Sequence, residues 1–222
     1  MIKAVIFDLD GVLLSTDEFH FQAWKKLADR EGIEFSRQIN ERLRGVSREE
    51  SLEIILEKTS RKYSTDEKLE MATCKNEIYK QLLEQLTPSD IFPGVMELLE
   101  FLKENNIKTA IGSSSKNTKF ILGQTGLAKY FTGAVSDGTN INRSKPDPEV
   151  FLKAAEFIDV PPSECLVVED ADAGIMAAKA AGMTAIGIGP AAKHPETDIP
   201  AKNTSEIQSV ITELICDCPM SA

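Results

Sequence analysis

Two aspartates, Asp8 and Asp10, follow a short apolar run and precede Gly11 and Val12. A buried strand ending here would bring both carboxylates to its carboxyl end, where open α/β sheets bind ligands. Carboxylates in such a place can hold a divalent cation or transfer a proton. A solvated turn is the competing interpretation, because Asp and Gly are also common in turns. The other strand ends of the chain decide between the two.

Polar side chains also follow two further apolar runs. One run ends at Glu169 and Asp170, another ends at the serine triplet 113–115, and Lys145 lies between these segments in the sequence. Carboxylate oxygens suit Mg²⁺, which usually shares its ligand shell with a phosphate. A lysine, hydroxyls and backbone N–H groups are what a phosphoryl group needs. An acidic patch without metal is the alternative, but the lysine and serines favour phosphoryl chemistry.

The elements that position these residues follow from the apolar pattern. Short apolar runs that do not alternate with polar residues are typical of parallel strands covered on both faces. Helical patterns lie between them, such as Val95, Leu98, Leu99 and Leu102 after Pro93-Gly94. The pattern predicts an α/β fold with a doubly wound, mostly parallel, Rossmann-like sheet. The predicted strands are Ala4–Phe7, Thr109–Gly112, Ala134–Val135, Leu166–Val168 and Thr184–Ile188.

Residues 14–87 contain amphipathic helical patterns but no convincing strand. Ser47 followed by Glu50 has the spacing of a capping box that opens a helix. We therefore expect an inserted all-helical domain over 14–87, with the α/β core formed by 1–13 and 88–222. The hinges are expected near residues 13–15 and 87–89.

The C-terminal part of the core is predicted to contain two helices separated by a loop. Ile175 to Ala181 has the composition of a helix that stops at Gly182. Prolines and small or charged residues from Pro190 to Ala201 predict a loop, and Ile207 to Leu214 a final helix.

Composition excludes some functional classes. The 222 residues include 25 Lys and Arg and 35 Asp and Glu, a formal charge of −10. This balance argues against a nucleic-acid partner, which would require a basic face. It does not exclude a small anionic substrate, because local charge decides that. Indeed, segment 14–87 holds 13 basic and 15 acidic residues, whereas the rest holds 12 and 20.

No apolar run approaches the roughly 20 residues that span a bilayer, so we expect no membrane partner. With two histidines in the chain and no zinc-type ligand spacing, the four cysteines are expected to be reduced thiols of a cytoplasmic protein. A metal role for Cys216 and Cys218 is disfavoured, because the pair lacks the two-residue spacer of zinc motifs.

The chain resembles the haloacid dehalogenase-like phosphotransferases over its whole length. Asp8-x-Asp10-Gly11-Val12 matches the first motif of that family, Ser113 the second, Lys145 the third and Glu169-Asp170 the fourth. The four motifs occur in the family's order. The helical insert is similar to the small cap domain of the family's first subclass.

Within that superfamily, the chain resembles the β-phosphoglucomutase family. The matching segments are His20-Phe21-x-Ala23-Trp24, Gly45-Val46-Ser47-Arg48-Glu49-x-Ser51, Lys75-Asn76 and Ser115-Lys116-Asn117. The chain departs from that pattern at four positions. Ser15 stands where Asp is frequent, Arg44 where Lys is usual, and Gly112 and Ser114 where Ala is common.

The resemblance implies roles for these residues. Asp8 would be the nucleophile, Asp10 the general acid and base oriented by Thr16 and His20, and Lys145 a cation that offsets charge repulsion. The expected cofactor is Mg²⁺, held by Asp8, the carbonyl of Asp10, Glu169 and Asp170. The residues expected to bind substrate are Arg44, Gly45, Val46, Ser47, Arg48, Ser51, Lys75, Asn76, Ser113, Ser114, Ser115, Lys116 and Asn117.

The implied reaction interconverts β-D-glucose 1-phosphate and glucose 6-phosphate through an aspartyl phosphate and β-glucose 1,6-bisphosphate. The implied partners are therefore sugar phosphates, and we expect a monomer. A phosphatase with the same nucleophile, metal and cap, acting on sugar phosphates or other phosphorylated metabolites, is the main alternative. A non-catalytic sugar-phosphate sensor is a third, although it predicts loss of Asp8, which is present. Packing is the simplest interpretation of Trp24. For Arg48, a solvated position in the first helical turn is the alternative to phosphate binding.

Overall fold

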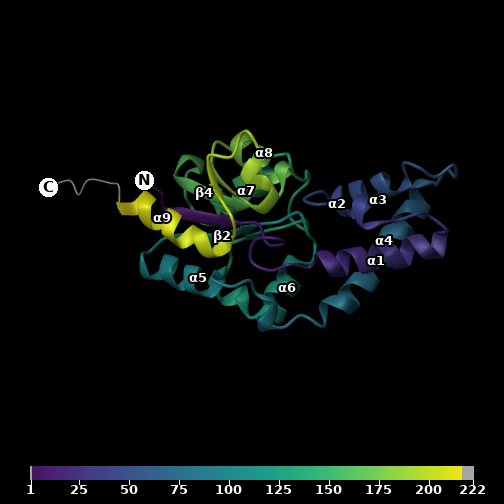
Figure 1. Ribbon diagram of the computed structural model, residues 1–222, viewed down its shortest axis with the longest axis horizontal. Coiled ribbons are helices and arrows are strands. Elements are labelled where there is room, and N and C mark those ends of the chain that lie inside the picture. The colour runs from purple at the N-terminus through teal and green to yellow at the C-terminus, as the bar shows by residue number, and fades with distance from the viewer. Residues whose placement is uncertain (1, 217–222) are drawn as a thin grey trace.

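A computed structural model describes residues 2–216 of the chain. Its centre is a single six-stranded sheet in the order β3-β2-β1-β4-β5-β6, in which every neighbouring pair is parallel. This arrangement confirms the doubly wound α/β fold (Figure 1). The strands are β1 Ala4–Phe7, β2 Lys108–Gly112, β3 Val135–Ser136, β4 Cys165–Glu169, β5 Thr184–Ile188 and β6 Ile199–Ala201.

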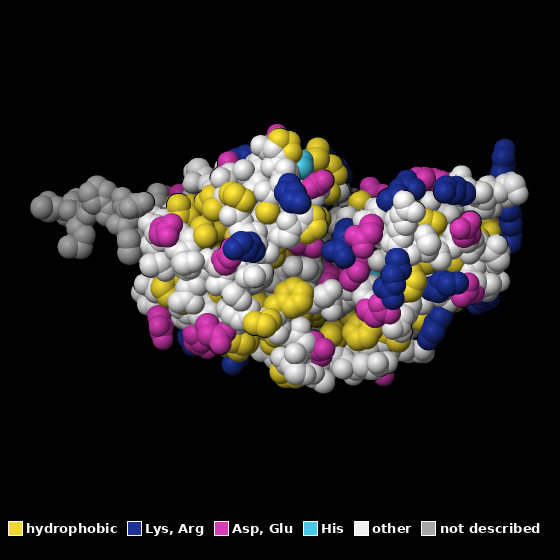
Figure 2. Space-filling model, in the orientation of Figure 1, with side chains coloured by type: hydrophobic (Ala, Val, Ile, Leu, Met, Phe, Trp, Pro, Cys, Tyr) yellow, Lys and Arg dark blue, Asp and Glu magenta, His cyan; other side chains and the backbone are white. Residues whose placement is uncertain are grey.

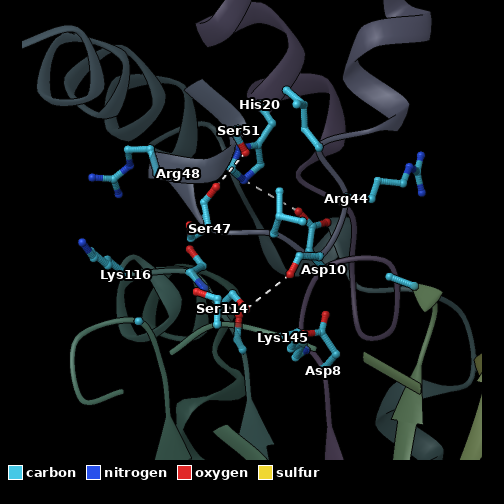
Figure 3. Close-up of a pocket in the computed structure, with 18 of the residues that line it drawn as sticks. Asp8, Asp10, His20, Arg44, Ser47, Arg48, Ser51, Ser114, Lys116 and Lys145 are labelled. Atoms are coloured by element: carbon cyan, nitrogen blue, oxygen red, sulfur yellow. Dashed lines mark hydrogen bonds and ion pairs between the residues drawn. The ribbon is translucent and has the colours of Figure 1, made fainter. Parts of the chain in front are cut away.

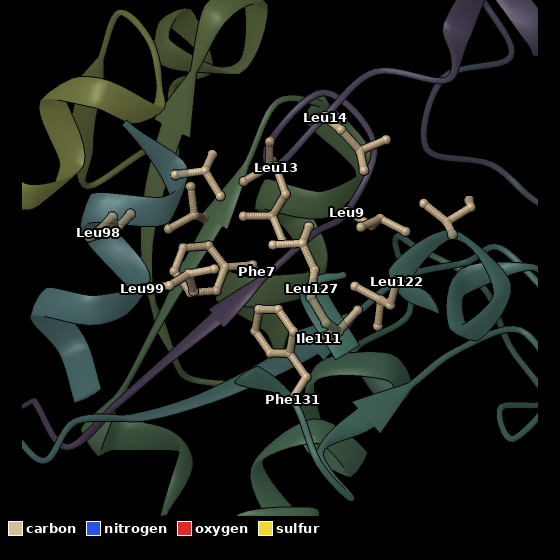
Figure 4. Packing of buried hydrophobic residues seen from close by; sticks show 14 of the residues in the cluster. Phe7, Leu9, Leu13, Leu14, Leu98, Leu99, Ile111, Leu122, Leu127 and Phe131 are labelled. Atoms are coloured by element: carbon tan, nitrogen blue, oxygen red, sulfur yellow. The ribbon is translucent and has the colours of Figure 1, made fainter. Parts of the chain in front are cut away.

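Helices cover both faces of the sheet. Helices α5 (Val95–Glu104), α6 (Thr118–Thr125) and α9 (Ile207–Cys216) lie on one face, and α7 (Glu149–Phe157) and α8 (Asp172–Ala180) on the other (Figure 1). In β1, Val5 and Phe7 pack with the first set, whereas Ala4 and Ile6 pack with the second. Figure 4 shows Phe7 against Leu99 of α5 and Phe131. Burial on both faces explains why the strands do not alternate.

Four helices between β1 and α5 form a separate lobe at one end of the molecule (Figure 1). They are α1 Asp17–Glu31, α2 Arg37–Glu41, α3 Arg48–Leu56 and α4 Thr65–Leu83. This lobe, here called the cap, has its own apolar core, which contains Trp24, Leu52 and Met71. The predicted capping box is confirmed, because Ser47 and Glu50 exchange both hydrogen bonds at the start of α3. Trp24 is 2% exposed.

The two chain segments that join the cap to the sheet lie side by side. Leu14 and Ile91 form an antiparallel bridge, and the backbone N–H of Phe92 donates to the carbonyl of Leu13 at 2.9 Å. Both crossings therefore occur at one point next to the end of β1. The cap is joined to the core there by two paired segments of backbone.

Part of the predicted loop 190–201 is wrong. Residues Ile199–Ala201 form β6, which pairs with β5 at the edge of the sheet. Pro200 led to the prediction of a loop, because proline has no N–H group to donate within a sheet. An edge strand tolerates proline when its nitrogen faces away from the neighbouring strand. The short 3₁₀ helices are Pro88–Asp90, Leu127–Tyr130, Pro162–Glu164, Gly189–Lys193 and Thr204–Glu206.

The other predicted elements can be compared with the described residues. The final helix is confirmed as α9, and α8 ends just before Gly182. Cys74 and Cys165 are free thiols, whereas the side chain of Cys216 and all of Cys218 lie outside the described part of the chain. No helix within residues 2–216 is both long and apolar enough to cross a membrane.

Candidate active site

A cavity of about 410 Å³ lies between the carboxyl edge of the sheet and the cap. The surface is hollowed between the two lobes, with charged side chains of both signs around the hollow (Figure 2). Nearly all residues singled out from the sequence line it. They are Asp8, Asp10, His20, Arg44, Gly45, Val46, Ser47, Arg48, Ser51, Lys75, Ser113, Ser114, Ser115, Lys116, Asn117, Lys145, Glu169 and Asp170. Thr16 and Asn76 do not line the cavity but contact residues that do.

Three carboxylates meet at the carboxyl ends of β1 and β4. One oxygen from each of Asp8, Glu169 and Asp170 lies within 4.8 Å of the others. Two glycines make this approach possible. A Cβ on Gly11 would lie 2.1 Å from Oδ2 of Asp170, and one on Gly174 would lie 1.9 Å from the carboxyl carbon of Glu169. The motif glycine after Asp10 is therefore required by the position of Asp170.

Lys145 is buried against two of these carboxylates. Its Nζ contacts Oδ1 of Asp8 and Oε1 of Glu169, and the lysine side chain is 1% exposed. Oε2 of Glu169 accepts the backbone N–H groups of Asp170 at 3.0 Å and Ala171 at 3.1 Å. Burial lowers the pKa of Lys145, but Asp8 and Glu169 outweigh it, and the pKa is raised. The lysine therefore stays charged.

One lysine does not balance three carboxylates. Burial raises the pKa of Asp170 to about 8, with further contributions from Glu169 and Asp8. Burial also raises the pKa of Glu169, as does the nearby Asp8. Such repulsion at a cluster of oxygen donors is relieved by a hard divalent cation, which prefers these ligands. The residues therefore fit a divalent cation.

Asp10 turns its carboxylate away from this cluster toward the start of α1. It accepts the backbone N–H of Thr16 at 2.7 Å and also the Thr16 hydroxyl, whose oxygen lies 2.8 Å from the Tyr79 hydroxyl. Burial raises the pKa of Asp10 to about 6. The bonds from Thr16 oppose the rise, and Asp8 and Asp17 add to it. A carboxyl group with this pKa can both donate and accept a proton near neutral pH.

The half-buried His20 and the buried Lys75 form a pair beside Asp10. Lys75 Nζ lies 2.8 Å from His20 Nδ1, and the lysine is 2% exposed between the rings of Trp24 and Tyr79. Burial and the nearby Lys75 lower the pKa of His20, so the ring is neutral. With Nδ1 facing Lys75, Nε2 faces Oδ2 of Asp10 at 4.0 Å. In the tautomer in which Lys75 donates to Nδ1, the ring proton lies on Nε2, on the side of that carboxylate.

Cationic side chains also lie at a second end of the cavity. In Figure 3, Arg48 and Lys116 lie together on the side away from Arg44, with Ser47 and Ser114 between the cap and the core. Lys116 pairs with Glu49 at 2.9 Å, and Ser114 Oγ donates to the Gly45 carbonyl at 3.4 Å. Asn117 donates to Asn76 at 3.0 Å. These contacts join the cap to the core.

Arg48 differs from its neighbours at this end. Within residues 2–216 it forms no ion pair, and burial lowers its pKa. The arginine is therefore a half-buried cation that lacks a counter-anion in the described residues. A second anionic group in the cavity would supply one.

Residues 2–182 match the family model of the haloacid dehalogenase-like hydrolases. The chain belongs to this family. It is 46% identical over 208 residues to the β-phosphoglucomutase of Bacillus subtilis, covering 93% of this chain and 92% of that protein. It is 35% identical over 188 residues to the phosphorylated carbohydrates phosphatase of Thermotoga maritima, covering 83% and 84%. The crystal structure of a β-phosphoglucomutase from Clostridium difficile superposes with a TM-score of 0.90 at 39% identity, covering 97% of this chain and 100% of that one.

The sequence did not indicate several lining residues of this haloacid dehalogenase-like site. Asp17, Asn40 and Tyr79 line the cavity but were not singled out. Asn40 donates to Asp17 at 3.0 Å, and both belong to the cap. Tyr79 lies one helical turn after Lys75, which is a signal that could have found it. Nothing in the sequence marks Asn40, because its contact is set by how α1 and α2 pack.

Proposed function

We propose that this chain is a Mg²⁺-dependent β-phosphoglucomutase, which interconverts β-D-glucose 1-phosphate and glucose 6-phosphate. One observation carries the proposal: the cavity has basic groups at two separate ends. Lys145 lies beside Asp8 at one end, and Arg48 and Lys116 lie at the other. A sugar with phosphate at two positions needs both ends, whereas hydrolysis of a monophosphate needs one. The relatives named β-phosphoglucomutase at 46% and 39% identity support the same activity.

Asp8 is the proposed nucleophile, and an aspartyl phosphate forms on it. Its carboxylate must approach a phosphate that is also negative, and Lys145 offsets that repulsion from a fixed, buried position. Asp8, the carbonyl of Asp10, Glu169 and Asp170 are the proposed ligands of Mg²⁺, which when bound would neutralise charge on the phosphoryl oxygens. Because Glu169 already binds Lys145 and two backbone N–H groups, it also holds the lysine in place.

Asp10 is the proposed general acid and base. When phosphate leaves the sugar, Asp10 protonates the departing oxygen; when a sugar hydroxyl attacks the aspartyl phosphate, Asp10 takes its proton. The raised pKa of Asp10, to about 6, supports both directions. Thr16 and the Nε2 side of His20 orient the carboxylate from the cap side.

The cap, proposed to span residues 14–87, gives the second phosphate its site. Arg48, Ser115, Lys116 and Asn117 are the proposed ligands, since guanidinium and ammonium groups suit phosphate. With the cap closed over the cavity, water is kept from the aspartyl phosphate until a sugar hydroxyl arrives. After one transfer the bisphosphate turns round, and the other phosphate faces Asp8. Arg44, Gly45, Val46, Ser47, Ser51, Lys75, Asn76, Ser113 and Ser114 complete the proposed substrate contacts.

The phosphatase of T. maritima at 35% identity makes hydrolysis of sugar phosphates the second candidate. One incubation separates the candidates. The protein is mixed with Mg²⁺, β-glucose 1-phosphate and a trace of β-glucose 1,6-bisphosphate, and glucose 6-phosphate and free phosphate are measured. Formation of glucose 6-phosphate supports the mutase, and formation of free phosphate alone supports the phosphatase. The absence of both products supports a sensor. A monomeric, cytoplasmic enzyme stays a prediction.

A variant tests the second phosphate site. Arg48→Ala removes a cap cation that lines the cavity and has no counter-anion among the described residues, and should lower mutase turnover far more than hydrolysis of a small aryl phosphate. Arg42→Ala is the matched control, because Arg42 pairs with Glu57 at 2.8 Å outside the cavity. Equal losses of both activities in Arg48→Ala would remove the reason for placing a phosphate beside Arg48.

A further inference from the structure

Arg44 is the one basic residue of the cap that reaches the carboxylate cluster in the described structure. All three of its guanidinium nitrogens face carboxylates. Nη2 lies 3.1 Å from Asp17, Nε lies 3.0 Å from Glu41, and Nη1 lies 3.5 Å from Oδ2 of Asp170. Asp17 and Glu41 belong to the cap, whereas Asp170 follows β4 in the core. The arginine thus bridges the two lobes.

The three carboxylates of the cluster are served by two different cations. Lys145 contacts Asp8 and Glu169, but among residues 2–216 the basic side chain that reaches Asp170 is Arg44. Lys145 is 1% exposed and fixed by the core, whereas the Arg44 side chain is 36% exposed. The first cation is permanent. The second is more exposed and comes from the other lobe, so it is not fixed by the core around Asp170.

We propose that Arg44 is a positioning residue that neutralises Asp170 in place of a divalent cation and competes with that cation for the carboxylate. This inference rests on the metal site of the proposed function. A guanidinium and a divalent cation repel each other, and both are attracted to the same oxygen atoms of Asp170, whose side chain is 12% exposed. Binding of the cation therefore weakens the Arg44 contact, and the Arg44 contact weakens binding of the cation.

The arginine can leave Asp170 without losing all its partners. Asp17 and Glu41 remain beside it in the cap, and Asn40 holds Asp17 through a 3.0 Å hydrogen bond. After release from Asp170, the guanidinium therefore keeps its ion pairs with two carboxylates of the cap. Coupling of this kind is reciprocal. If binding of the cation disfavours the cap position in which Arg44 contacts Asp170, that cap position lowers the affinity for the cation by the same factor. Cation binding without phosphate should then loosen the cap.

Calorimetric titration of the phosphate-free protein with Mg²⁺ tests the competition. Arg44→Ala should tighten Mg²⁺ binding about fivefold, the order expected for charges a few ångström apart at a solvated site. Arg44→Lys, which keeps the charge but has one nitrogen, should fall between Arg44→Ala and the unchanged protein. Arg42→Ala removes the same charge two residues away and should change affinity less than about twofold. Thermal unfolding of each variant checks that it is folded.

Weaker or unchanged Mg²⁺ binding in Arg44→Ala would overturn the proposal. Equal tightening in Arg42→Ala would also overturn it, because the effect would then come from net charge. Small-angle scattering gives the second readout. Mg²⁺ should enlarge the radius of gyration of the unchanged protein but not that of Arg44→Ala. If Mg²⁺ does not change the radius of gyration of the unchanged protein, the link between cation binding and the cap is refuted. No sugar phosphate is present, so these results do not depend on whether the enzyme is a mutase or a phosphatase.

Discussion

Gly11→Ala tests whether the reaction depends on the position of the Asp170 carboxylate, apart from the strain that any L-residue has at the positive φ of Gly11. Gly11 has a φ of +87°, and a Cβ there would lie 2.1 Å from Oδ2 of Asp170. Ordinary contact begins at 3.4 Å, so the carboxylate must retreat by about 1.3 Å. Mg²⁺ tolerates only small departures from octahedral geometry, and errors of about 1 Å in a catalytic site can cost about 100-fold in rate. We therefore expect a rate loss of about 100-fold and a higher Mg²⁺ requirement.

Gly32→Ala is the matched control. Gly32 ends α1 with a φ of +68°, and nothing lies within 4 Å of the added Cβ. Both variants should lose about 1–2 kcal/mol of unfolding free energy, because an L-residue is strained in the left-handed region. Urea unfolding with excess chelator measures this shared cost, and turnover across a Mg²⁺ titration measures the difference. Normal rate and Mg²⁺ dependence in Gly11→Ala would show that the position of Asp170 does not matter to the reaction.

Three further changes test other parts of the site. Gly174→Ala puts a Cβ 1.9 Å from the Glu169 carboxyl and should cost more than about tenfold in turnover, whereas Gly123→Ala, in an open helical position, should be active and about 0.5–1 kcal/mol more stable by urea unfolding. Equal turnover in the two would contradict the role of Glu169. Asp10 has its pKa raised from 3.8 to about 6, so its contribution to stability is present below about pH 4 and lost as pH rises through 6. Between pH 4 and pH 7, the unfolding free energy of metal-free Asp10→Asn should therefore rise by about 1 kcal/mol relative to that of the unchanged metal-free protein. The change is this small because the Asp10 side chain is 35% exposed and solvent screens its charge. A fall in the relative unfolding free energy over this range would refute the raised pKa. Lys145→Ala leaves two buried carboxylates unpaired and should cost about 3–5 kcal/mol in the chelated protein, and a loss below about 1 kcal/mol would mean that the lysine is not their counter-ion.

The sequence predicts the sheet and the cluster at its edge because both depend on local pattern. Apolar runs mark strands that are buried on both faces, and parallel strands send their carboxyl ends to one edge. The pattern of the sequence alone is therefore enough to bring Asp8, Glu169 and Asp170 together, whereas Lys145 lies in the loop before α7. β6 escaped prediction because its three residues include Pro200 and its pairing is decided by the neighbouring strand.

Contacts between elements far apart in the chain could not be predicted in the same way. The Thr16–Tyr79 contact joins residues 63 positions apart, and its existence depends on the way α1 packs against α4. The partners of Arg44 depend on the tilt of the whole cap, so the sequence marked the residue without indicating that it faces Asp170. Side-chain chemistry identifies candidates, whereas the packing of helices decides which of them meet.

The placement of cations explains how a chain of net charge −10 can handle doubly negative substrates. Lys145 is buried with two carboxylates, so in the proposed reaction its charge would serve the reacting phosphate throughout the cycle. Arg48 has no counter-anion among the described residues, which leaves it available to a second phosphate, while Arg44 is held by three carboxylates and can exchange one of them. In the proposed mechanism, a fixed cation, a free cation and an exchangeable cation therefore have different tasks in one cavity. Net charge, which counts them equally, cannot distinguish those tasks.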